Sequence, residues 1–276
     1  MVHEHTTQPA IEPMWKRRPD WLVAEIDAKF AKIGPTIPIN YGRHGENPNY
    51  QIATTNFRDL VAHERERAGR LRILEVGCAA CYLITQNEWA AGDIVHGLTA
   101  HDYRNQERYP HTPPADSNNY FIGNAEHLDQ IEQLLPEYDI VLSLYTLQHL
   151  IDRAGSLEQI ANKVALGGLL CLDRFQPYDK FSPFDSWRRG ATHPLPQMGL
   201  YAPKMLRILT KSSFRRANLR AVAPQRQVPR HPGEGHVVLR REQVAPVRFG
   251  LNYERVEPIE NELWVPTWRY TTLLSG

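Results

Sequence analysis

The stretch that decides the fold is RILEVGCAAC, residues 72–81, in which a short, mostly apolar run ends at Gly77. Apolar side chains follow one another without the strict alternation of a half-solvated strand, as they do in a strand buried on both faces of a sheet. Gly77 then indicates a turn, because glycine adopts backbone conformations that other residues avoid. The stretch therefore predicts a central strand that leads directly into a loop.

Further apolar runs follow along the chain at residues 94–98, 119–122, 138–143 and 169–173. Helix-length stretches separate most of them, at residues 81–91, 125–135 and 156–164. Strands that alternate with helices form βαβ units, in which a parallel sheet is covered by helices on both faces. We therefore predict an α/β fold with a doubly wound, mostly parallel sheet.

The flanking segments add elements to this sheet. Helices are expected at residues 21–33 and from a cap at Thr54 or Thr55 to about residue 68, with Gly69 just beyond its end. Residues 34–50 contain three prolines and three glycines, which favours a loop. Nearer the C-terminus we expect a helix at residues 203–210 and an antiparallel strand pair, with its strands at residues 219–222 and 237–239.

The composition excludes several classes of protein. The chain has 276 residues, 42% of them hydrophobic, so a core can form. Lys plus Arg number 32 and Asp plus Glu 31, and a net charge of +1 argues against a nucleic-acid binder or an acidic-membrane binder. No apolar run reaches the roughly 18–20 residues that span a bilayer. A start without signal-peptide features and only three cysteines favour the reducing cytoplasm.

In a doubly wound sheet, ligands bind beyond the carboxyl ends of the strands, and here those ends resemble the class I S-adenosylmethionine-dependent methyltransferases. The family loop reads acidic-x-Gly-x-Gly-x-Gly. Glu75 and Gly77 match it, whereas Ala79 and Cys81 stand at the second and third glycines. The phrases YFIGNAEHL (120–128), YDIVLSLYTLQHLID (138–152) and LGGLLCLD (166–173) resemble later family segments in the family's order.

The resemblance implies S-adenosylmethionine as the cofactor and a set of residues that bind it. The Asp102 carboxylate would accept hydrogen bonds from the ribose hydroxyls. The family's acidic residue usually ends the strand, where Thr99 stands here. Asn124 stands where the family often has an Asp near the adenine. The full cofactor-binding set is Glu75, Gly77, Cys78, Ala79, Asp102, Asn124, Ala125, Ser143 and Leu144.

The resemblance also implies methyl transfer to a small molecule, an amino acid or a natural-product intermediate. Residues 36–50 precede the first strand, where family members often have a lid over the cofactor. Aromatic faces there could hold a sulfonium, and an arginine could hold a substrate carboxylate. We name as catalytic candidates Tyr41, Tyr145 and His149, and as substrate-binding candidates Arg43, Tyr50 and Arg174. The chain could also form a homodimer.

On this basis the chain divides into an N-terminal helical lid segment (1–69), a Rossmann-like cofactor domain (70–244) and a C-terminal tail packed on that domain (245–276).

Other functions remain open. The altered loop at residues 79–81 also fits enzymes that transfer the cofactor's aminocarboxypropyl arm, or that close a ring and release methylthioadenosine. Modification of a tRNA wobble uridine is disfavoured by the net charge, and a non-catalytic binding protein is a further alternative. The spacing of Cys78 and Cys81 is that of a redox or zinc motif, but no second pair accompanies it, so we expect loop packing and no metal.

Overall fold

The computed structural model describes residues 12–32, 51–52, 55–78, 89–103, 119–144, 146–147, 150–175, 219–221, 226–228, 231–243, 245–248 and 253. The helices are α1 (Met14–Arg17), α2 (Asp20–Lys32), α3 (Phe57–Ala68), the 3-10 helix η1 (Ala125–Gln130) and α5 (Arg153–Asn162). The strands are β1 (Gln51–Ile52), β2 (Thr55–Asn56), β3 (Arg72–Val76), β4 (Ile94–Thr99), β5 (Tyr120–Ile122), β6 (Tyr138–Leu144), β7 (Val164–Phe175), β8 (Leu219–Ala221), β9 (Arg226–Val228) and β10 (His231–Arg241).

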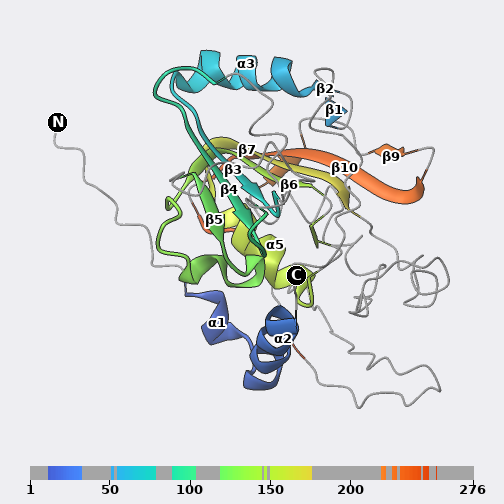
Figure 1. The fold of residues 1–276 in the computed structure, drawn as a ribbon. Helices are drawn as coiled ribbons and strands as arrows, with labels where there is room; N and C mark the ends of the chain where they lie inside the picture. Colours follow the sequence, from blue (N-terminus) through green and yellow to red (C-terminus); the bar gives the residue numbers. More distant parts are fainter. Residues whose placement is uncertain are drawn as a thin grey trace.

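The central sheet has the strand order β5-β4-β3-β6-β7-β10-β8, and β9 pairs with β10 (Figure 1). The strands from β5 to β7 are parallel to their neighbours, whereas β10 is antiparallel to β7, β8 and β9. From β3 the chain proceeds outward to β4 and β5, and then returns to β6 and β7 on the other side. This doubly wound, mostly parallel sheet with antiparallel C-terminal strands confirms the predicted Rossmann-like fold. The winding reverses between β3 and β6.

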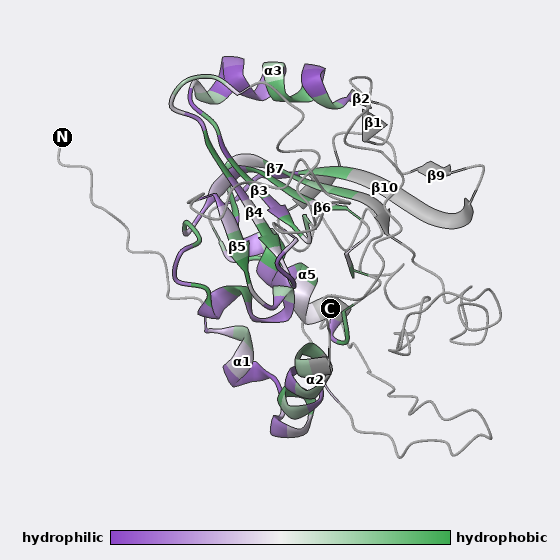
Figure 2. Ribbon diagram, viewed as in Figure 1, coloured by the Kyte–Doolittle hydropathy of each residue, from purple (hydrophilic) through white to green (hydrophobic). Residues whose placement is uncertain are grey.

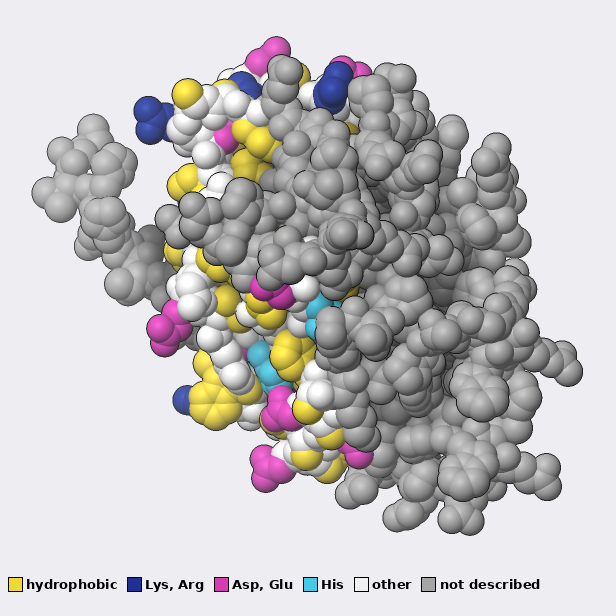
Figure 3. Space-filling model, in the orientation of Figure 1, with side chains coloured by type: hydrophobic (Ala, Val, Ile, Leu, Met, Phe, Trp, Pro, Cys, Tyr) yellow, Lys and Arg dark blue, Asp and Glu magenta, His cyan; other side chains and the backbone are white. Residues whose placement is uncertain are grey.

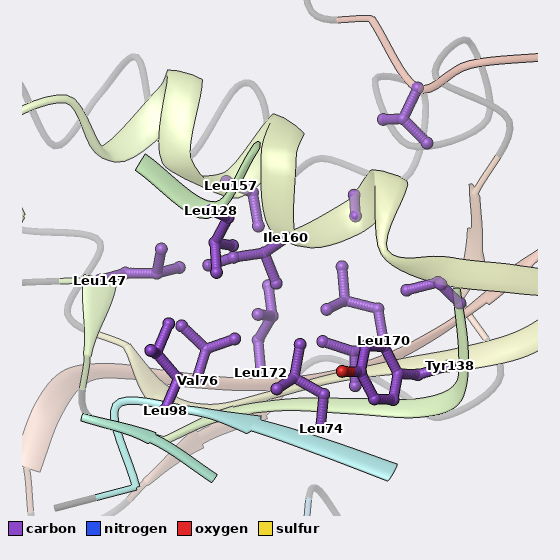
Figure 4. Packing of buried hydrophobic residues seen from close by; sticks show 14 of the residues in the cluster. Leu74, Val76, Leu98, Leu128, Tyr138, Leu147, Leu157, Ile160, Leu170 and Leu172 are labelled. Atoms are coloured by element: carbon purple, nitrogen blue, oxygen red, sulfur yellow. The ribbon is translucent and has the colours of Figure 1, made fainter. Parts of the chain in front are cut away.

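One face of the sheet packs against α5 and η1. Leu74, Val76 and Leu98 point from the strands toward Leu157 and Ile160 of α5, as Figure 4 shows. These side chains are fully buried. Each contributes roughly 1.5–3 kcal/mol relative to an exposed position. The opposite face packs against α3, so helices cover the sheet on both sides as predicted.

The helix α3 forms because its apolar residues recur on one side. Phe57, Leu60 and Val61 are buried against the sheet, and Figure 2 shows hydrophobic and hydrophilic residues interspersed along the helix. The side chain of Asn56 accepts a hydrogen bond from the amide of Arg58 at 2.9 Å and caps the helix. Neither Thr54 nor Thr55 is therefore the cap that the sequence suggested. Thr55 belongs to β2, and Thr54 lies outside the described residues.

Other expected elements differ in extent. A helix was expected over residues 125–135, but η1 ends at Gln130, and His127 inside it has non-helical backbone angles (φ −124°, ψ 41°). The Glu126 carboxylate accepts hydrogen bonds from the amides of Ile151 and Asp152, which ties this short helix to the segment just before α5. Strand β7 begins five residues before the predicted 169. Most of the helix expected at 81–91 and all of the one at 203–210 lie outside the described residues.

Candidate functional site

Three strand ends lie level with one another at the point where the winding reverses. Val76 at the end of β3 is in register with Leu98 of β4 and with Ser143 of β6. Their carboxyl ends therefore open at the same edge of the sheet, where ligands bind in doubly wound folds.

The turn at Gly77 is held from two sides. Gly77 has a φ of 80°, which suits glycine, as the sequence predicted. The amides of Gly77 and Cys78 donate to the Leu98 carbonyl at 2.7 and 2.9 Å, which ties the turn to β4. The Thr146 hydroxyl lies 3.0 Å from the carbonyl oxygens of both Val76 and Leu144, which ties the turn to β6. Sequence reasoning missed Thr146, because a lone loop threonine belongs to no recognisable spacing.

Glu75 is the main electrostatic feature of this edge. Its side chain is buried, and its Oε2 atom has no hydrogen-bond partner in the described part of the chain. Burial raises the pKa of Glu75 to about 8, so the carboxyl group is largely protonated at neutral pH. The Ser143 hydroxyl, from the neighbouring strand β6, is also buried and likewise lacks a partner among these residues. Unpartnered buried polar atoms are uncommon, and a bound ligand is one explanation for them.

The segment after β4 contains Asp102, which is exposed. The hydroxyl of Tyr120 on β5 donates to the His101 carbonyl at 3.1 Å and accepts from the Tyr103 amide at 3.3 Å, so this segment is fixed over β5. The Nε2 atom of His101 is buried and has no partner within the described ranges. Burial lowers the pKa of His101, which favours a neutral imidazole.

The turn after β5 begins at Asn124. Its side-chain oxygen accepts a hydrogen bond from the Glu126 amide at 3.0 Å and caps η1. That oxygen is therefore engaged with the backbone, while Ala125 packs partly buried against the core. Leu144, at the end of β6, packs against the opposite core cluster and accepts through its carbonyl from Thr146.

The structure places Glu75, Gly77 and Ser143 at or just beyond the ends of the neighbouring strands β3 and β6, with the Glu75 and Ser143 side chains on opposite faces of the sheet. It does not describe every candidate. Tyr41, Arg43, Tyr50, Ala79, Tyr145 and His149 lie outside the described residues. Arg174 belongs to β7, and the position of its side chain is not among the described features.

The cysteines differ from the expectation of simple loop packing. Cys78 is buried and disulfide-bonded, whereas Cys171 in β7 is a buried free thiol. The odd number of cysteines had argued against any disulfide framework. Within the described ranges, no group of three or more His, Cys, Asp or Glu side chains could hold a metal ion.

Two further findings concern membrane-spanning helices and clusters of basic side chains. In the described part of the chain, no helix combines the length and the apolar character needed to cross a bilayer. In the view of Figure 3, the described Lys and Arg side chains are scattered rather than gathered into one patch.

No protein-family model and no curated protein matches the chain. Solved structures that resemble it include magnesium protoporphyrin IX methyltransferase from Synechocystis with bound S-adenosylhomocysteine (13% identity, 80% of this chain and 94% of that one, TM-score 0.42). Others are the 1,6-didemethyltoxoflavin-N1-methyltransferase of Burkholderia thailandensis (12%, 88% and 99%, 0.42) and an O-methyltransferase from Bacillus cereus (15%, 81% and 92%, 0.43). With TM-scores below 0.5 these likenesses carry no conclusion about function, and the fold assignment rests on the strand order and register.

Proposed function

We propose that the chain is an S-adenosylmethionine-dependent transferase that methylates a small molecule. The observation that supports this most strongly is the buried Glu75 carboxyl group, whose Oε2 has no partner in the described part of the chain. A buried carboxyl group without a counter-ion favours a cationic ligand, because a bound cation stabilises the ionised form.

The residues around the switch point fit such a cofactor. The amino acid arm of the cofactor carries an ammonium group, which would donate a hydrogen bond to the Glu75 carboxylate. The absence of a side chain at Gly77 keeps the loop thin. Asp102 is exposed after β4, where it could accept ribose hydroxyls, and Asn124 with Ala125 would border the adenine. The bound cofactor would supply an electrophilic methyl group on a sulfonium.

The chain's own part in methyl transfer is alignment and, where the acceptor must lose a proton, base catalysis. Tyr41, Tyr145 and His149 are our candidates for groups near the acceptor, and Arg43, Tyr50 and Arg174 for groups that bind it. We propose that the acceptor is an amino acid or a natural-product intermediate and that the reaction takes place in the cytoplasm.

The first test is titration calorimetry of the full chain with S-adenosylhomocysteine. We expect a single-site isotherm for the wild type and at least about tenfold weaker binding for Glu75→Gln, which cannot become a counter-ion. Glu132→Gln, at an exposed position of the turn after η1, is the matched control and should bind like the wild type. An absence of binding by the wild type would indicate a non-catalytic scaffold and would overturn the proposal.

The second test identifies the chemistry by mass spectrometry of the cofactor's products during incubation with amino acid and natural-product acceptors. Formation of S-adenosylhomocysteine supports methyl transfer. Formation of methylthioadenosine instead would favour transfer of the aminocarboxypropyl arm or ring closure, and would overturn the methyltransferase assignment while leaving the cofactor site intact.

A further inference from the structure

Arg18, which directly follows α1, carries a buried guanidinium group that contacts η1 and the start of α5. Its side chain has no solvent exposure, and its Nε atom donates to Asp152 Oδ2 at 2.6 Å. A terminal nitrogen donates to the carbonyl oxygen of Glu126 in η1, and the other lies 3.4 Å from the Ser156 hydroxyl of α5. One cation thus joins η1 to the start of α5.

Glu126 and Asp152, which accept hydrogen bonds from Arg18, are also linked to each other by hydrogen bonding. The Glu126 carboxylate accepts from the amides of Ile151 and Asp152 at 2.9 and 2.6 Å. The Asp152 carboxylate accepts from the Gly155 amide at 2.8 Å and from the Tyr253 hydroxyl at 2.7 Å. Two buried carboxylates therefore face the Arg18 cation, and a neutral side chain at position 18 would leave both without it.

The rest of the N-terminal segment, residues 12–32, binds the same two elements. The Met14 amide donates to Asp129 Oδ2 at 2.7 Å, and Asp27 Oδ1 of α2 lies 3.0 Å from His127 Nε2. Leu22 and Ile26 pack on Ile151. Figure 1 shows α1 and α2 beside the end of the sheet from which η1 and α5 begin. The segment therefore holds the turns that follow β5 and β6.

These contacts reach the part of the proposed cofactor site that would bind the adenosine moiety, called the nucleoside site below. Arg18 binds the carbonyl of Glu126, and the amide of the same residue donates to the side-chain oxygen of Asn124. Ala125 lies between them in sequence. The Glu126 carboxylate also accepts hydrogen bonds from the amides of residues 151 and 152. These residues follow Thr146, whose hydroxyl holds the turn at Gly77, by a few positions in sequence.

We propose that Arg18 is a positioning residue for the nucleoside site, so that docking of residues 12–32 and binding of the nucleoside favour each other. This inference rests on the proposed function. The mechanism is a coupling: the segment holds the turns after β5 and β6 in the arrangement that binds, and the ligand in turn selects the docked segment. A variant at position 18 should therefore lose affinity as well as stability.

The matched variants are Arg18→Met, Arg18→Lys and Arg17→Met. Arg17 carries the same charge and pairs with Glu158 of α5, which also has Arg248 at 3.5 Å. Within the described residues, the Arg17 side chain forms no ion pair with η1. Calorimetry with S-adenosylhomocysteine should show about tenfold weaker binding for Arg18→Met, partial recovery for Arg18→Lys, and an affinity within about twofold of the wild type for Arg17→Met.

A second readout uses the unaltered full chain, so it does not depend on whether a variant folds. Hydrogen exchange followed by mass spectrometry should show slower exchange in residues 12–32 when S-adenosylhomocysteine is bound, which a merely structural role for Arg18 would not produce. Unchanged exchange there, or a folded Arg18→Met that binds as tightly as the wild type, would overturn the inference. A wild type that does not bind at all would instead overturn the proposed function.

Discussion

Thr146 occupies the space into which a side chain at Gly77 would project. A β-carbon built on Gly77 would lie 2.0 Å from Thr146 Oγ1 and 2.6 Å from its Cγ2. The same threonine hydroxyl lies between the carbonyl oxygens at the ends of β3 and β6. The shape of the turn at the proposed cofactor site therefore depends on a glycine and a threonine from neighbouring strand ends.

Gly77→Ala should destabilise the fold for two reasons. The left-handed backbone costs about 1–2 kcal/mol with a β-carbon, and the clash with Thr146 adds to it. Gly69→Ala is the matched control, because Gly69 has a similar φ of 73° but no atom within 4 Å of the new carbon. Chemical denaturation should show a larger loss for Gly77→Ala than for Gly69→Ala. Equal losses would mean that Thr146 moves aside freely.

The ionisation of Glu75 should make stability depend on pH. Burial raises the pKa of this group from 4.5 to about 8, so folding favours its protonated form. The free-energy cost of keeping this group buried is absent below about pH 4.5, grows by about 1.4 kcal/mol per pH unit, and is complete above about pH 8. The free energy of unfolding of the wild type should therefore fall relative to that of Glu75→Gln as pH rises from 5 to 8. Parallel pH profiles for the two proteins would contradict the burial of an unpartnered carboxyl group.

Glu64 should show the opposite dependence. Burial alone would raise the pKa of Glu64, but hydrogen bonds from Arg240 and Arg67 outweigh it and lower the pKa. Its contribution is therefore present above about pH 4.5 and is lost as pH falls below that value. At pH 7, Glu64→Gln should lower the free energy of unfolding by about 2 kcal/mol, the scale of a hydrogen bond to a charged group. The difference should shrink in denaturant titrations at pH 4 and below, and a difference that grows there would refute the assignment.

Cys171 should be inert in the folded protein. Its thiol is fully buried in β7, and burial raises its pKa well above the usual range, so little thiolate forms. Iodoacetamide should modify Cys171 at least about a hundredfold more slowly in the native protein than after unfolding in guanidinium, as measured by peptide mass spectrometry. Rapid labelling of the native protein would show that this strand opens locally.

The sheet could be predicted from sequence because its strands are buried on both faces, which leaves apolar runs such as the one at 138–144. The full length of β7 could not, because Gly167 and Gly168 resemble a turn. In the structure Gly167 has a φ of 75° inside the strand, and the pairing of β6 with β7 shifts register after Tyr138. Such an irregularity depends on the neighbouring strand, which local sequence does not reveal.

The positions of candidate residues could be predicted where a residue sits at or just beyond a strand end, as Glu75, Gly77 and Ser143 do. The contacts that hold the site were not. Arg18 and Asp152 are 134 residues apart in sequence, so their ion pair leaves no spacing to recognise. Sequence patterns mark the elements and their ends, whereas buried polar contacts between distant segments follow from the packed fold.

The measurement that tests the central claim most directly is a crystal structure of the full chain with S-adenosylhomocysteine. The nucleoside should lie beyond the carboxyl ends of β3 and β6, with its ammonium group within roughly 3 Å of the Glu75 carboxylate and its adenine beside Asn124 and Ala125. Electron density showing that protein side chains occupy this space, with the ligand bound elsewhere, would contradict the account.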